Sequence, residues 1–107
     1  MVINGVNFPE QEIAAFCGRY AVARLSLFGS ILREPSGEGG TGFRPTSDVD
    51  MLVEFRVGQT PSLLDFAGMQ LELSALIGRE VHLHTLAMLS PYFRNAVARE
   101  ARMLHAA

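Results

Sequence analysis

The sequence lacks most of the features that would assign it to a specialised class of protein. It contains one cysteine, Cys17, so an internal disulfide framework is excluded. Its net charge is -2, so the basic face that direct nucleic-acid binding requires is not expected. No apolar run approaches the roughly 18 residues that cross a bilayer, and no signal peptide is apparent. These absences predict a cytoplasmic protein that contacts neither a membrane nor nucleic acid directly.

The chain does have enough apolar content to build a core. Of its 107 residues, 49% are hydrophobic, which predicts one domain over residues 1–107. Cys17 lies in the apolar stretch IAAFCGRY, where a free cysteine usually behaves as a small hydrophobic residue. We therefore expect a buried thiol rather than a nucleophile.

Helices and strands are expected to alternate along the chain. Apolar spacing, caps and glycine stops predict an α/β fold with one small sheet and helices packed on it. In the second long helix, apolar residues recur near helical spacing at Leu64, Ala67, Leu71 and Leu76. The expected elements are helices over 7–20, 62–78 and 90–105, strands over 21–29, 49–55 and 80–86, and a glycine-rich loop over 34–47.

The strand near the C-terminus carries two histidines in the stretch VHLH. His82 and His84 are two positions apart, so an extended strand turns both imidazoles to the same face. Such a pair is consistent with a metal clamp, an altered active site or a polar surface.

Two further short motifs carry polar groups at the ends of predicted strands. Gly29 and Ser30 follow the first strand, and glycine allows a backbone to approach a phosphate closely. Asp48 and Asp50 share one side at the start of the next strand, where their charges repel unless a cation lies between them. Mg²⁺ takes carboxylate oxygens readily. Each motif alone also fits an ordinary turn or a solvated surface.

The two motifs together resemble the minimal nucleotidyltransferase (MNT) domains of the DNA polymerase β-like superfamily. The resemblance covers nearly the whole chain and is carried by LSLFGS, SDVDMLVEF and the closing LSPYFRNAVAREARMLH. It implies a small mixed sheet flanked by helices, with ATP and Mg²⁺ or Mn²⁺ as cofactors. It also implies an antitoxin that transfers AMP to a tyrosine of a HEPN toxin, which is an RNase. Because the chain is too short for the second domain of larger relatives, a homo- or hetero-oligomer is expected.

The resemblance also implies roles for particular residues. Asp48 and Asp50 match two metal ligands, and Gly29 and Ser30 match the phosphate-binding pair. Arg33 is expected to contact phosphate or the partner.

Two features depart from the family pattern. The segment Ile31–Ser47 is longer than usual because of a glycine-rich insertion over 35–42. A surface loop tolerates such added residues at a small cost in free energy. In GREVHLHTL, His82 stands where the family has its third catalytic carboxylate. Imidazole is a poor Mg²⁺ ligand but can accept a proton or bind a transition metal. The sequence therefore leaves three readings open: altered catalysis, an inactive module that neutralises the toxin by binding, and a transition-metal site.

Overall fold

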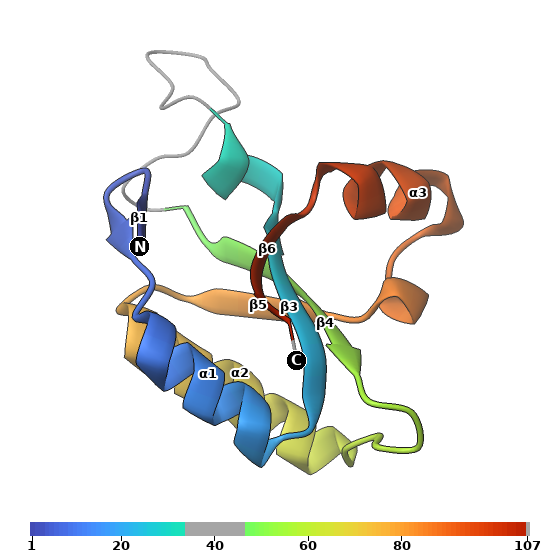
Figure 1. Ribbon diagram of the computed structural model, residues 1–107. Helices are drawn as coiled ribbons and strands as arrows, with labels where there is room; N and C mark the ends of the chain where they lie inside the picture. The colour runs from blue at the N-terminus through green and yellow to red at the C-terminus, as the bar shows by residue number, and fades with distance from the viewer. Residues whose placement is uncertain (34–46, 107) are drawn as a thin grey trace.

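The computed structural model describes residues 1–33 and 47–106, and a four-stranded mixed sheet lies at its centre (Figure 1). The strands lie in the order β5-β4-β3-β6. β3 is antiparallel to both β4 and β6, whereas β4 and β5 are parallel. This arrangement confirms the predicted α/β class with a small mixed sheet. The strands span Val22–Phe28 (β3), Val49–Phe55 (β4), Val81–His84 (β5) and Arg102–Ala106 (β6).

Three helices flank this sheet, and their ends follow the capping signals in the sequence. The side chain of Ser62 accepts a hydrogen bond from the Asp65 amide at 3.1 Å, and Gly78 ends the same helix with a left-handed φ of 73°. Ser90 caps the last helix, whose first residue is a proline. The helices span Glu10–Arg19 (α1), Leu63–Ile77 (α2) and Pro91–Glu100 (α3), with short 3₁₀ turns at Gly29–Leu32 (η1) and Leu86–Met88 (η2).

One side of the sheet, which we call the closed face, packs against α1 and α2 (Figure 1). Alternate strand residues point to this side, and they are almost entirely apolar and buried. Burying one such side chain contributes about 1.5–3 kcal/mol. The buried members are Leu25 and Leu27 of β3, Val49, Met51 and Val53 of β4, and Val81 and Leu83 of β5, together with Ile13, Phe16, Cys17, Met69 and Leu73 of the helices. The predicted burial of Cys17 is confirmed.

The opposite side of the sheet, which we call the open face, is covered only in part. No residue of α3 is buried, and a pocket of about 130 Å³ lies between this helix and the sheet. Ser26, Leu52 and Ala98 are among the residues that line the pocket, so α3 lies over the open face. Towards the other end of the strands, this face carries Asp50, His82 and His84.

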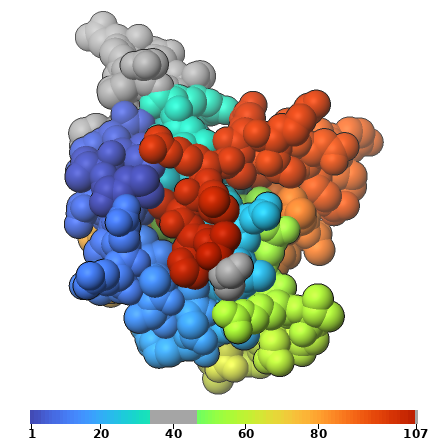
Figure 2. Space-filling view, viewed as in Figure 1, coloured from blue at the N-terminus to red at the C-terminus, as the bar shows by residue number. Residues whose placement is uncertain are grey.

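The prediction that the last helix extends to residue 105 is wrong. α3 ends at Glu100, and Ala101 leaves the helix with φ -58° and ψ 133°. Residues 102–106 then form β6, which pairs with β3 and lies across the surface in Figure 2. Without β6, the edge of β3 would expose unpaired backbone groups, and Leu104 would lose its contacts with the core.

The residues whose spacing predicted α2 do not form its buried side. Leu64 and Leu71 are 82% and 71% exposed, and Ala67 is exposed too, whereas Met69 and Leu73 are fully buried. Leu76 does pack against the core. Because α2 carries apolar residues around most of its circumference, the periodicity predicts the helix but not its buried face.

The N-terminus forms a short hairpin that was not predicted. β1 (Val2–Ile3) and β2 (Val6–Asn7) are antiparallel, and two-residue strands give too little alternation to be recognised in a sequence. Within the described residues, no helix is long and apolar enough to cross a membrane. The glycine-rich insertion over 35–42 lies outside the described residues.

Candidate active site

The start of β4 presents both aspartates on the open face. Val49 lies between Asp48 and Asp50 and is fully buried, so strand alternation turns the two carboxylates to the opposite side. Backbone and side-chain hydrogen bonds fix this segment. The Val49 amide donates to the Glu80 carbonyl at 2.9 Å, and Arg79 Nη2 donates to the Ser47 carbonyl at 2.8 Å. The aspartates therefore occupy a constrained position beside β5.

Gly29 lies directly against Asp50. Phe28, the last residue of β3, pairs with Asp50 across the sheet, and the chain turns at Gly29 with φ +79°. A Cβ atom at this position would lie 2.7 Å from Asp50 Oδ2, so the carboxylate would have to move to admit a side chain. Glycine is therefore favoured here both by the left-handed backbone and by the position of the carboxylate.

The residues after Gly29 form the 3₁₀ turn η1 and lead to Arg33. Asn4 of the N-terminal hairpin fastens this turn, because its Nδ2 donates to the carbonyls of Ile31 and Arg33, both at 2.7 Å. Ser30 lies within the turn and is half-buried. Arg33 is exposed and lines a pocket of about 320 Å³ together with Gly29. The role of Asn4 was not predicted, since nothing local in the sequence links it to this turn.

β5 places both histidines next to the aspartates. In the parallel pairing of β4 and β5, Asp50 lies beside His82. The Nε2 atom of His82 is 3.1 Å from Asp48 Oδ2, and the Nε2 atom of His84 is 3.5 Å from Asp50 Oδ1. Each imidazole thus faces one of the two aspartates, and the two histidines share the open face.

The outer edge of β5 is held by α2 rather than by another strand. Ser74 Oγ accepts a hydrogen bond from the Val81 amide at 2.9 Å, and Gln70 Oε1 accepts one from the Leu83 amide at 2.9 Å. The ring of Phe28 meets that of His84 edge-on, with centroids 5.3 Å apart. These contacts limit the movement of the strand that carries the imidazoles.

Glu80 joins the site although the sequence analysis did not select it. Its Oε1 atom lies 3.7 Å from His82 Nε2. Asp48, Glu80 and His82 form a group that could hold a metal ion, with the three ligand atoms within 4.8 Å of one another. The signal was present in the sequence, because Glu80 and His82 are two positions apart on one face of a strand.

Similarity to known proteins decides the family. A sequence profile of the nucleotidyltransferase domain matches residues 10–104. The chain belongs to the nucleotidyltransferase domain family. This confirms the resemblance that LFGS and SDVD suggested, and the structure places both motifs of this nucleotidyltransferase domain at one end of the sheet.

A relative and a solved structure, each more than 30% identical to this chain, support the assignment. The nucleotidyltransferase domain is 33% identical over 96 residues to a Methanocaldococcus jannaschii protein assigned as a protein adenylyltransferase. That match covers 90% of this chain and 94% of the archaeal protein. A solved structure assigned as a minimal nucleotidyltransferase is 35% identical with a TM-score of 0.65, and the match covers 86% and 85% of the two chains.

A more distant structure shares the fold. It is a chain in a solved complex of a tri-AMPylated HEPN toxin from Shewanella oneidensis with an MNT antitoxin. The TM-score is 0.61 at 17% identity, and the match covers 92% of this chain and 70% of that one.

Proposed function

We propose that this nucleotidyltransferase domain is an antitoxin that transfers AMP from ATP to a tyrosine of a partner HEPN toxin and thereby neutralises it. The observation that carries the proposal is the pair of carboxylates, Asp48 and Asp50, set against the side-chain-free turn at Gly29. The adenylyltransferase assignment of a relative and the AMPylated toxin complex support the choice of reaction and partner. We propose that the protein and this partner act together in the cytoplasm.

Asp48 and Asp50 are the proposed ligands of Mg²⁺ or Mn²⁺. Both carboxylates emerge on the open face, and their oxygens suit a hard divalent cation. The fit is supported by the space that Gly29 leaves beside Asp50, which a Cβ atom would fill. When bound, the ion would neutralise charge on the phosphate oxygens of ATP.

Gly29, Ser30 and Arg33 are the proposed contacts of the triphosphate. Gly29 has no side chain of its own to hinder the approach of the phosphates to the backbone, and the Ser30 hydroxyl can donate a hydrogen bond. Arg33 brings an exposed guanidinium to the pocket that Gly29 lines, and this group suits phosphate oxygens. The three residues follow one another closely and occupy one end of the sheet.

The reaction forms one bond and breaks another. The tyrosine oxygen bonds to the α-phosphorus of ATP as the bond from that phosphorus to the bridging oxygen breaks, and pyrophosphate leaves. The hydroxyl proton passes to water, which reaches this site because the side chains of Asp48 and His82 are 47% and 42% exposed. His82 stands where the family pattern has a carboxylate, and its Nε2 atom faces Asp48, so it would help to hold the cation.

A second candidate function follows from His82 itself. Loss of the third carboxylate removes one negative charge from the site, which lowers its attraction for Mg²⁺. The module would then neutralise the toxin by stoichiometric binding.

Transfer of labelled AMP distinguishes the two functions. The chain is incubated with labelled ATP, Mg²⁺ or Mn²⁺ and its HEPN partner, and the label on the toxin and the remaining RNase activity are measured. We expect the wild type and an Asp65→Asn control on α2 to label and silence the toxin, and the Asp48→Asn/Asp50→Asn variant to do neither. Absence of label with every metal, with the toxin still silenced, would favour stoichiometric binding.

A further inference from the structure

A group of three metal-ligating side chains shares Asp48 with the proposed catalytic pair. Its members are Asp48, Glu80 and His82. The Nε2 atom of His82 lies 3.1 Å from Asp48 Oδ2 and 3.7 Å from Glu80 Oε1. For metal bonds of about 2.0–2.2 Å, neighbouring ligands of one ion lie about 2.8–3.6 Å apart. The three atoms therefore lie close enough together for small side-chain movements to bring them around one cation.

The imidazole of His82 turns its Nε2 atom towards two carboxylates. Its Nε2 atom is shielded from solvent, and none of the described residues forms a hydrogen bond with it. A shielded nitrogen that lies beside carboxylates without a well-formed hydrogen bond is suited to hold a cation between them. The orientation of this atom towards two carboxylates shows where such a cation would lie.

The backbones that carry the three ligands are fixed to one another before any ion binds. The Glu80 carbonyl accepts a hydrogen bond from the Val49 amide at 2.9 Å, which ties the residue before β5 to the start of β4. Ser74 Oγ holds the next amide, that of Val81, from the other side. Since Glu80 and His82 alternate with the buried Val81, both ligands emerge on the same face. Little ordering of the backbone is then needed on binding.

The chemistry of the ligands selects the kind of metal. Mg²⁺ prefers an all-oxygen shell, whereas imidazole nitrogen suits Zn²⁺, Co²⁺ and Mn²⁺. We propose that Asp48, Glu80 and His82 form a divalent metal site that binds these transition metals in preference to Mg²⁺. The proposal concerns binding alone, so it can be tested whether or not the chain transfers AMP.

Co²⁺ is a suitable probe because its visible absorption reports nitrogen and oxygen ligands directly. Untagged full-length protein is titrated with Co²⁺, and the bound ion is then displaced with Zn²⁺ or Mg²⁺. We expect one Co²⁺ per chain, displaced by Mg²⁺ only at concentrations about tenfold or more above those of Zn²⁺. Displacement by Mg²⁺ as readily as by Zn²⁺ would overturn the proposal.

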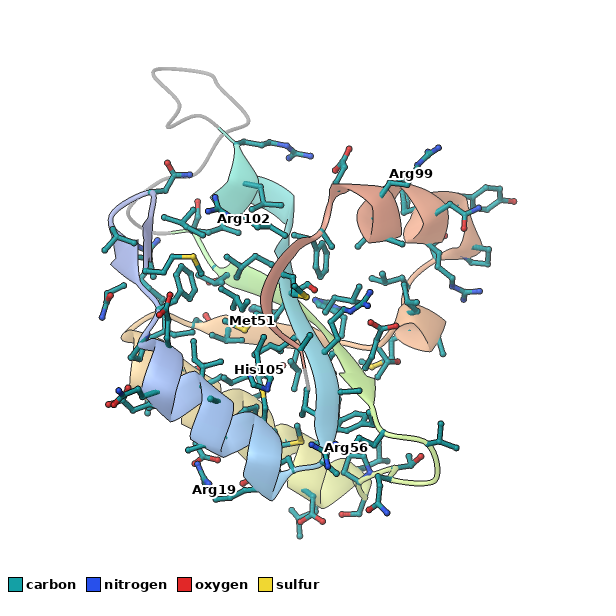
Figure 3. All side chains as sticks on the ribbon, in the orientation of Figure 1. Arg19, Met51, Arg56, Arg99, Arg102 and His105 are labelled. Carbon is teal, nitrogen blue, oxygen red and sulfur yellow. The ribbon has the colours of Figure 1, made fainter. Side chains whose placement is uncertain are left out.

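Variants test whether the named residues are the ligands. His82→Asn is expected to weaken Co²⁺ binding by about tenfold or more, and His82→Asp is expected to shift the preference towards Mg²⁺. His105→Asn is the matched control, since His105 belongs to β6 on the other edge of the sheet (Figure 3), and it should bind Co²⁺ as the wild type does.

Circular dichroism establishes that each variant is folded. If His82→Asn fails to fold, Glu80→Gln carries the test, because the Glu80 side chain is 70% exposed and its loss should weaken Co²⁺ binding severalfold. Wild-type affinity for Co²⁺ in a folded His82→Asn or Glu80→Gln protein would show that the site lies elsewhere.

Discussion

The two faces of the sheet are built from the same strands, yet they carry different chemistry. On the closed face, Val49 and Val81 are fully buried against the core, whereas their neighbours Asp50 and His82 reach the open face. One step along a strand separates a residue that stabilises the fold from a residue that can bind a ligand. Substitutions on the closed face should therefore act on stability, and those on the open face should act on function.

Leu27→Ala, on the closed face, should have the largest effect on stability. Leu27 is fully buried, so truncation should lower the free energy of unfolding by about 2–5 kcal/mol. Urea unfolding followed by circular dichroism measures this, since the chain has no tryptophan for fluorescence. Leu71→Ala is the matched control, because Leu71 is 71% exposed and its loss should change stability by about 0.5 kcal/mol or less. Equal losses in both variants would refute the assignment of the core.

Gly29→Ala should lower both the stability of the fold and the affinity for nucleotide, because Gly29 joins β3 to the open-face site. The new methyl group would meet Asp50 Oδ2 in a left-handed backbone conformation, at a cost of about 1–3 kcal/mol. Nucleotide binding, measured by calorimetry with a non-hydrolysable ATP analogue, should weaken as well.

Gly18→Ala serves as the control for this substitution. Gly18 lies in α1 with no atom within 4 Å of a built Cβ, so alanine there should raise stability by about 0.5–1 kcal/mol. A Gly29→Ala protein with unchanged stability and nucleotide affinity would contradict the role assigned to the turn.

The Cys17 thiol should have the smallest effect on the free energy of unfolding, and this effect should depend on pH. Burial under the closed face raises the pKa of the Cys17 thiol from 9.0 to about 11. Above pH 9 the unfolded chain loses this proton first, so the free energy of unfolding should be about 1 kcal/mol lower at pH 10 than at pH 8.

The measurement compares urea unfolding of the wild type and Cys17→Ala at both pH values. Each protein gives a change in the free energy of unfolding between pH 8 and pH 10. The difference between these two changes isolates the thiol from the other groups that titrate. A thiol-reactive reagent should also leave native Cys17 unmodified at pH 8. Rapid modification of the folded protein would show that the closed face does not protect this residue.

Much of the fold could be predicted because local signals and tertiary packing agree. The alternation in VDMLVEF, the serine caps at Ser62 and Ser90 and the stop at Gly78 all correspond to elements of the structure. β6 could not be predicted, since ARMLH continues the composition of the preceding helix and becomes a strand only by pairing with β3. The buried side of α2 could not be predicted either, because packing against the sheet, and not the helical spacing, determines that Leu73 is buried and Leu71 is exposed.

The site was predictable to the extent that it depends on residues close together in sequence. Spacing alone places Asp48 with Asp50 and His82 with His84 on common faces. The distance between these pairs depends on the register of β4 against β5, which only the folded sheet sets. The same register brings Asp48 to Glu80 and His82, which the spacing of Glu80 and His82 alone could not show.

The Asp48→Asn/Asp50→Asn variant tests the division between the two faces most directly. Its free energy of unfolding and its transfer of labelled AMP to the HEPN partner are measured on one preparation. We predict stability within about 1 kcal/mol of the wild type, because both side chains are at least one-third exposed, together with loss of transfer. Retained transfer, or loss of transfer only because the protein unfolds, would contradict the account.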